Sequence, residues 1–241
     1  MKQVIVMAAG MGARMKELTK EIPKPLIKIE DKPMLEINIE YMIDAGIDRV
    51  VIIVGYFKEK FIYLKEKYRN QIEILFIENH RYANTNTIYS LFCACNEFIC
   101  DSYITTADNY LLENLYIKYQ ADYSFYLLRP VQHFQKEEWV VSLDTNMRFL
   151  AVDLHGHDGN SYSGVSFWKH KDLLYIKKCL ETIDWSREQV KKMYWDNILL
   201  PHLDEFPIYA KIMEDNREFY EVDDIDDLRT LEIYLKGKGN L

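Results

Sequence analysis

The sequence lacks the long apolar runs of a membrane protein. No apolar run in its 241 residues approaches the ~20 residues that cross a bilayer as a helix. A secretory signal would need a longer apolar stretch than the one near the N-terminus, followed by a small-residue cleavage site. We therefore expect a cytoplasmic protein that does not insert into a membrane.

The sequence also has few cysteines and no excess of positive charge. The first argues against a zinc site, and the second against a nucleic-acid binder. Of the four cysteines, three crowd one segment (Cys93, Cys95 and Cys100), and neither a second cluster nor a histidine pair completes a zinc site. The net charge of −8 argues against a nucleic-acid binder, which neutralises phosphates with lysine and arginine. A small anionic ligand stays compatible with this charge, because one basic loop is enough to bind it.

Repeats, low-complexity tracts and Ser/Gly linkers are absent, so the sequence predicts one domain over residues 1–241. Strand and helix patterns alternate in the first half, which predicts a parallel, doubly wound sheet. The expected strands are 3–7, 49–54, 72–77, 102–106, 123–128, 139–143, 149–154, 164–168 and 208–213, and the expected helices 33–45, 57–68, 87–95, 171–182, 188–200 and 225–235. We interpret the later strands as extending the same sheet. The predicted fold class is therefore α/β, with a Rossmann-like mixed, mostly parallel sheet flanked by helices.

The loop after the first expected strand has the composition of a phosphate-binding loop. Small residues, among them Gly10 and Gly12, let backbone amides approach a phosphate. Arg14 adds a forked cation that matches phosphate oxygens. Farther along, Lys24 stands between two prolines whose rings restrict the backbone, so that the lysine is presented from a stiff loop.

Three other interpretations of this loop are possible. A Walker A loop needs Gly-Lys-Ser/Thr, which is absent. A dinucleotide fingerprint needs a third glycine in place of Met15 and an acid in place of Gly55-Tyr56. The third is a glycine turn followed by a surface lysine run, since lysines recur every fourth residue from Lys16 to Lys32. Prolines interrupt the helix that this spacing needs, and the combined pattern favours phosphate binding.

Carboxylates follow an expected strand and recur near the C-terminus. Asp108 comes directly after an apolar strand, where ligands bind in open α/β sheets. Mg²⁺ in such sites takes one or two carboxylates with phosphate oxygens, and strand alternation would place Glu221 and Asp223 on one side as further candidates. The alternative is a solvated acidic face: residues 214–227 hold eight acids and one arginine, and Asp224 could cap the last helix.

Together these motifs resemble the nucleotide-diphospho-sugar transferase superfamily. The motifs are Ala-Ala-Gly-x-Gly-x-Arg at 8–14, Pro-Lys-Pro at 23–25 and Ala-Asp-Asn at 107–109. Within it, the chain is similar over nearly its full length to the bacterial CTP:phosphocholine cytidylyltransferases of the LicC type, most specifically at 162–168, 194–197 and 219–223, and also at 54–61. The resemblance implies that superfamily's fold, with a nucleotide-binding half at about 1–120 and a substrate-binding or lid half at about 121–241.

The resemblance also implies roles for individual residues. Arg14 would bind the β- and γ-phosphates, and Lys24 the α-phosphate together with the incoming phosphate. Asn86 would read the pyrimidine or ribose, while Asp108 and Asp223 would hold Mg²⁺. Backbone groups of the first loop would contact the nucleotide: Ala8, Ala9, Gly10 and Gly12. Aromatic and acidic residues would surround the choline end: Trp139, Tyr194, Trp195, Asp196, Tyr220 and Glu221. Thr106 departs from the family, which often has an acid there.

The implied reaction is attack of a phosphocholine oxygen on the α-phosphorus of CTP, which yields CDP-choline and pyrophosphate. The nucleophile is already anionic, so catalysis would rest on positioning and charge stabilisation by Mg²⁺, Lys24 and Arg14. Aromatic faces and carboxylates suit the quaternary ammonium.

Two alternatives stay open at this point. One is a transferase for phosphoethanolamine, 2-aminoethylphosphonate or a sugar-1-phosphate. The other is a catalytically idle nucleotide-binding regulator, against which the presence of Arg14, Lys24 and Asp108 argues. The sequence does not indicate the oligomeric state.

Overall fold

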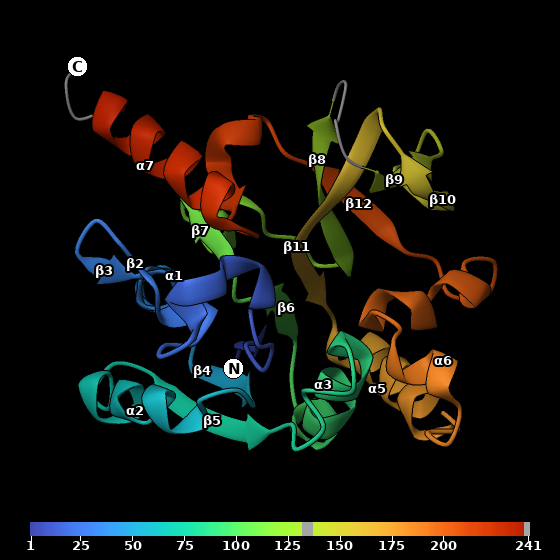
Figure 1. Cartoon of the computed structure of the whole chain (residues 1–241). Helices are drawn as coiled ribbons and strands as arrows, with labels where there is room; N and C mark the ends of the chain where they lie inside the picture. The colour runs from blue at the N-terminus through green and yellow to red at the C-terminus, as the bar shows by residue number, and fades with distance from the viewer. Residues whose placement is uncertain (132–136, 239–241) are drawn as a thin grey trace.

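The computed structural model describes residues 1–131 and 137–238 as one large sheet covered by helices (Figure 1). The strands of the main sheet are β1 (Gln3–Met7), β4 (Arg49–Val54), β5 (Glu73–Glu78), β6 (Ser102–Thr106), β8 (Phe125–Val131), β9 (Glu138–Leu143), β10 (Phe149–Gly156), β11 (Gly159–Trp168) and β12 (Tyr209–Ile212). Short strands form two separate pairs: β2 (Lys28–Ile29) with β3 (Lys32–Pro33), and β7 (Asn109–Leu111) with β13 (Phe219–Glu221). The helices are α1 (Met34–Asp44), α2 (Tyr63–Lys67), α3 (Thr87–Ala94), α4 (Leu115–Lys118), α5 (His170–Glu181), α6 (Glu188–Lys191) and α7 (Ile225–Lys238).

The first half of the chain forms a parallel block, as its alternating pattern predicts. β5, β4, β1 and β6 lie side by side in that order, each parallel to its neighbour. Met7 on β1 is in register with Thr106 on β6, so the loops that follow these two strands leave the same edge of the sheet. This register brings the glycine-rich loop close to Ala107-Asp108.

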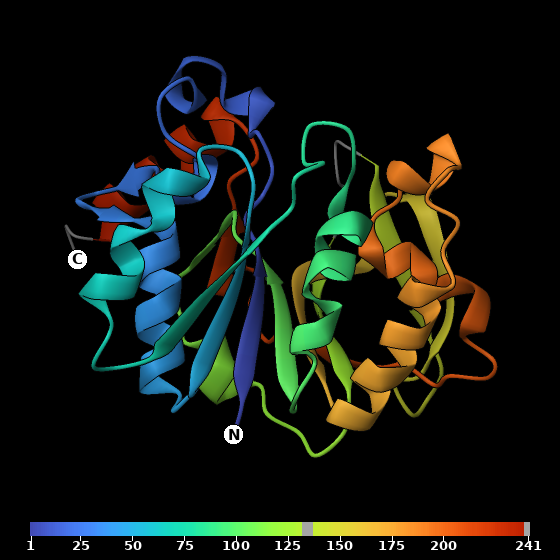
Figure 2. The same ribbon diagram turned by 90° about the horizontal axis from the view of Figure 1, so that it is seen from below.

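Helices cover both faces of the parallel block (Figure 2). Val50 of β4 belongs to the core cluster that includes Leu35 of α1, whereas the next residue, Val51, joins the cluster that includes Leu91 of α3. Successive strand side chains point to opposite faces, so a continuous run of β-branched residues is buried on both sides. Gly46, with φ of 67°, ends the α1 turn in the left-handed region that glycine adopts without strain.

The second half extends the same sheet with reversed polarity. β11 runs antiparallel to β6 and also pairs with β8 and β9, while β10 continues the sheet beyond β9. β12 adds to β8 in parallel. The expected α/β class, with a mixed sheet flanked by helices, is confirmed.

Two expected helices are wrong, and one strand pairing was not expected. The helix expected at 188–200 is broken: α6 ends at Lys191, Tyr194 is extended at φ −72° and ψ 155°, and a 3-10 turn spans Trp195–Ile198. The helix expected at 57–68 is likewise split, into a 3-10 turn and α2, behind Phe57 in the left-handed region. The pairing of β7 with β13 joins positions more than a hundred residues apart.

Within the described part of the chain, no helix combines the length and apolar character that crossing a membrane requires.

Candidate active site

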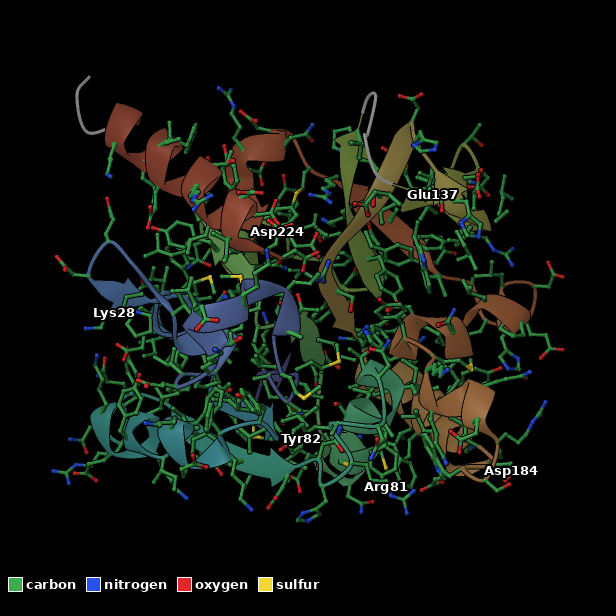
Figure 3. The ribbon with its side chains drawn as sticks, in the orientation of Figure 1. Lys28, Arg81, Tyr82, Glu137, Asp184 and Asp224 are labelled. Atoms are coloured by element: carbon green, nitrogen blue, oxygen red, sulfur yellow. The ribbon has the colours of Figure 1, made fainter. Side chains whose placement is uncertain are left out.

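A cavity of about 640 Å³ lies beyond the carboxyl ends of β1 and β6, within the size range of small-ligand sites. Most of the residues singled out from the sequence line it: Ala8, Gly10, Gly12, Arg14, Lys24, Asn86, Asp108, Trp139, Tyr194, Trp195, Asp196, Glu221 and Asp223. Figure 3 labels two landmarks around it, Asp224 beside the first turn of α7 and Glu137 next to β9. The cavity therefore draws on segments from the whole length of the chain.

The glycine-rich loop is shaped to accept the lysine behind it. Gly12 adopts the left-handed region, at φ 61° and ψ 34°. A Cβ atom there would lie 2.9 Å from the Cβ of Lys24, closer than side chains approach, so only glycine allows this packing. Lys24 begins a 3-10 turn, and its side chain is only 9% exposed. The two phosphate-loop motifs thus form one structure.

Charged side chains meet at the end of the cavity that the glycine-rich loop and Lys24 form. The Nζ of Lys24 lies 3.0 Å from Asp108 Oδ2 and 3.2 Å from Asp223 Oδ1, and Nη2 of Arg14 lies 2.8 Å from the same Asp223 oxygen. Burial alone would lower the pKa of Lys24, but the two carboxylates outweigh it and raise that pKa. Burial would raise the pKa of Asp108, and the Lys24 ammonium outweighs it and lowers that pKa. Lys24 and Asp108 are therefore both ionised at neutral pH.

The β7–β13 pairing brings Asp223 to this position. Glu221 is in register with Asn109, and the backbone N–H of Val222 donates to the Asp108 carbonyl at 3.0 Å. Asp224 faces away: its Oδ1 accepts from the N–H groups of Asp226 and Asp227 and caps α7. The cap interpretation thus fits Asp224, whereas Asp223, one residue earlier, faces the cavity.

Asp108 and Asp223 could serve as ligands of a divalent cation. Asp108 Oδ1 is buried and accepts no hydrogen bond from any residue that the structure describes. Over residues 1–131 and 137–238, no group of three or more His, Cys, Asp or Glu side chains is arranged to hold a metal. Asp108 and Asp223 could therefore complete a divalent-cation site only with ligands from outside the protein, such as phosphate oxygens and water.

Aromatic rings form the other end of the cavity. The Trp139 ring centroid lies 5.6 Å from that of Tyr194 and 5.8 Å from that of Tyr162, with both pairs near perpendicular. Trp195 is only 4% exposed and stacks on Tyr126 at 5.7 Å. Trp139, Tyr162 and Tyr194 line the cavity, and we call them the aromatic cage. Trp195 also lines the cavity, but its ring packs on Tyr126 and Trp168.

Carboxylates stand beside the aromatic cage. Asp196 Oδ1 accepts a 2.8 Å hydrogen bond from the Tyr126 hydroxyl, and burial raises the pKa of Asp196 to about 6. Burial and the nearby Asp108 charge raise the pKa of Glu221 to about 7, although Arg129 opposes them. Nη2 of Arg129 lies 3.3 Å from Glu221 Oε2. Rings with acids suit an organic cation better than an anion.

Some residues do not lie where the sequence suggested, and others were missed. Tyr220 does not line the cavity, because its ring packs 5.2 Å from that of Tyr234 on α7. Ala9 is also absent from the lining, and its carbonyl accepts from the Tyr56 N–H. Tyr126, Tyr162 and Arg129 were missed, although Tyr162 opens the segment that carried the resemblance. The strand pattern gave no signal for Arg129.

Asn86 lines the cavity with its side chain already engaged. Its Oδ1 accepts from the Thr87 N–H at 2.8 Å and caps α3, and its Nδ2 donates to the Lys192 carbonyl at 3.2 Å. Each polar end of this amide thus makes one hydrogen bond within the protein, and the base- or ribose-reading role expected for Asn86 stays a prediction.

Comparisons with known proteins agree with this geometry. Residues 3–124 match the family described as Nucleotidyl transferase. The chain is 33% identical to the choline-phosphate cytidylyltransferase of Streptococcus pneumoniae, covering 98% of this chain and 100% of the relative. It is 28% identical to the 2-aminoethylphosphonate cytidylyltransferase of Lancefieldella rimae, covering 93% and 89%. A solved structure of the CTP:phosphocholine cytidylyltransferase LicC of Streptococcus pneumoniae aligns with a TM-score of 0.87 at 33% identity, covering 97% of this chain and 99% of that one.

Proposed function

The chain belongs to the nucleotidyl transferase family, and from that premise we propose that it converts CTP and phosphocholine into CDP-choline and pyrophosphate. The observation that carries the proposal is one cavity with two chemically different ends. Lys24, Arg14 and two carboxylates stand at one end, and the aromatic cage with Asp196 stands at the other. The proposed substrate has the same division, an anionic phosphate and a quaternary ammonium.

The chain's own cations serve the phosphate end. A phosphocholine oxygen forms a bond to the α-phosphorus of CTP while the bond to the bridging oxygen of pyrophosphate breaks. Because the nucleophile is already an anion, the barrier lies in repulsion between anions and in charge on the leaving group. Lys24 supplies a buried positive charge against both, and Arg14 supplies an exposed one suited to the terminal phosphates.

We propose Mg²⁺ as the cofactor, with Asp108 and Asp223 as its protein ligands. The buried and unbonded Oδ1 of Asp108 supports this assignment, and one or two carboxylates are the usual protein share of a Mg²⁺–phosphate site. When bound, the ion would stabilise negative charge on the phosphate oxygens. Lys24 pairs with both of these carboxylates, and Arg14 pairs with Asp223.

The cage end selects the second substrate. A trimethylammonium group cannot donate a hydrogen bond from nitrogen, so ring faces and carboxylates are its natural partners, at about 0.5–2 kcal/mol per ring. Trp139, Tyr162 and Tyr194 supply the rings, and Asp196 supplies a carboxylate. The second candidate function is cytidylyl transfer to 2-aminoethylphosphonate, which the similarity to the Lancefieldella cytidylyltransferase supports. The primary ammonium of that substrate would bind to the carboxylates.

We further propose the cytoplasm as the site of action, where CTP is available, with no nucleic-acid partner. The division into a nucleotide-binding half (about 1–120) and a substrate-binding half (about 121–241) is also part of the proposal. Asp223 is an exception to it, because it comes from the second half and contacts Lys24 of the first.

Pyrophosphate release by the purified protein tests the proposed function. With Mg²⁺ present, release is expected only when CTP and phosphocholine are both added, and the product has the mass of CDP-choline. Replacing CTP by ATP, GTP or UTP tests the nucleotide, and replacing phosphocholine by glucose-1-phosphate tests the acceptor. Turnover of a sugar phosphate without turnover of phosphocholine would overturn the proposal.

The aromatic cage yields a prediction for Trp139. Trp139→Ala is expected to lower kcat/KM for phosphocholine about 10–30-fold, mainly through KM, because a ring contact and its buried area are lost. The KM for CTP stays within about twofold. Trp139 suits this test better than Trp195, since alanine at the buried Trp195 would open a core cavity worth about 3–5 kcal/mol of stability.

Tyr123→Ala provides the control for Trp139. Tyr123 is a partly exposed aromatic residue outside the cavity, so its variant should keep the wild-type kinetics. An unchanged KM for phosphocholine in Trp139→Ala would remove Trp139 from the cage. An equal rise in both KM values would mean that the variant disturbs the whole site.

A further inference from the structure

The first turn of α3 is bonded to a segment more than a hundred residues later in the chain. The backbone N–H of Asn86 donates to the Lys191 carbonyl at 2.7 Å, and the Asn86 side chain donates to the Lys192 carbonyl. In return, the backbone N–H of Trp195 donates to Thr87 Oγ1 at 3.0 Å. Arg81 and Tyr82, labelled in Figure 3, stand in the loop that leads into this turn.

The hydrogen bond from the Trp195 N–H to Thr87 lies at the start of a 3-10 turn. The chain leaves α6 at Lys191, extends through Tyr194 and re-enters a 3-10 turn at Trp195. The first N–H groups of a turn have no partner within it, so the Trp195 N–H requires one from elsewhere. The Thr87 hydroxyl supplies it, and helps to fix where the extended backbone of Tyr194 stops.

This short segment carries much of the cage end of the cavity. Tyr194 is 51% exposed and faces Trp139, Trp195 stacks on Tyr126, and Asp196 accepts from the Tyr126 hydroxyl. The first turn of α3, to which this segment is bonded, is rigid, because Ile88 and Leu91 of α3 are fully buried against the sheet. Thr87 therefore links a rigid helix to the least regular part of the site.

We propose that Thr87 is a positioning residue for the amine end of the cavity, acting through the Trp195 backbone. The proposal rests on the proposed function only for the identity of the amine. Thr87 does not reach the cage rings through any hydrogen bond of its own, and its effect is to keep Tyr194 and Asp196 in place.

Two substitutions at Thr87 isolate this hydrogen bond. Thr87→Val keeps the size and branching of the side chain but removes the acceptor, whereas Thr87→Ser keeps the hydroxyl. Thr87→Val is expected to raise KM for phosphocholine about tenfold, because a lost hydrogen bond loosens the segment, with the KM for CTP within about twofold. Thr87→Ser should stay within about twofold of wild type in both.

Hydrogen exchange gives a readout that needs no substrate. Backbone amides of residues 194–197 should exchange at least tenfold faster in Thr87→Val than in wild type, and at the wild-type rate in Thr87→Ser. Unchanged exchange in Thr87→Val, or an equal rise in both KM values, would overturn the positioning role. If Thr87→Val does not fold, Thr87→Ala carries the same test.

The exchange result also separates this inference from the proposed function. If wild type turns over a different acceptor, the proposed function fails. Thr87→Val should then raise KM for that acceptor and still exchange faster. If wild type uses phosphocholine and Thr87→Val neither exchanges faster nor changes its KM, the positioning role alone fails.

Discussion

Asp108→Asn is expected to lower kcat by about 10²–10³-fold while the protein stays folded. Asparagine has nearly the same shape but no charge, and it places an N–H₂ donor or a neutral oxygen where the buried Oδ1 now stands unbonded. Lys24 keeps Asp223 as a partner at 3.2 Å, so the variant does not leave a buried cation alone. Steady-state kinetics over a Mg²⁺ titration, with a thermal melt for folding, measure this effect.

Asp223→Asn should have a similar effect, and Asp226→Asn provides its matched control. Asp226 belongs to the same acidic run but its side chain is 88% exposed and pairs with Arg229 on the surface. Its variant carries the same charge change and should keep normal turnover. Near-normal Mg²⁺-dependent turnover in Asp108→Asn or Asp223→Asn would remove that residue from the metal role.

Lys24→Ala is expected to lower kcat by about 10²–10³-fold, with a much smaller change in the KM for CTP. A buried cation at the reacting phosphate acts mostly on charge that develops in the transition state, so its loss lowers kcat more than it weakens binding. Arg14→Ala is expected to raise the KM for CTP instead, because the exposed guanidinium suits ground-state phosphates.

Lys20→Ala is the control for the lysine substitution. Lys20 belongs to the same lysine run, yet its side chain is 67% exposed and pairs with Glu17 outside the cavity. Normal kinetics in Lys20→Ala would show that the effect of Lys24→Ala does not come from net charge. A change in KM alone for Lys24→Ala would contradict its place at the reacting centre.

Local patterns were enough to predict the parallel half of the fold. After Arg49, every residue of the strand at 49–54 is β-branched, and a strand buried on both faces needs nothing more. The helix expected at 188–200 is interrupted by a local hydrogen bond, from the Tyr194 N–H to Asn197 Oδ1, and by partners far away in sequence. The Trp195 N–H bonds to Thr87, and the Asn86 N–H bonds to Lys191. No pattern within 188–200 reports such contacts.

The site shows the same division between local and distant causes. Asp108 could be found because a strand end is a local feature. The alternation that placed Glu221 and Asp223 on one side also puts Tyr220 on the other, where it packs on α7. Tyr126 could not be assigned to the cavity, since its strand pattern does not distinguish a core face from a site wall.

A direct competition between two acceptors tests the central claim. The purified protein is given CTP, Mg²⁺ and equal concentrations of phosphocholine and 2-aminoethylphosphonate, and the two cytidylyl products are separated and quantified. We expect about tenfold or more CDP-choline over the other product, because the aromatic cage favours three methyl groups over a strongly hydrated primary ammonium. Equal amounts, or an excess of the aminoethylphosphonate product, would contradict it.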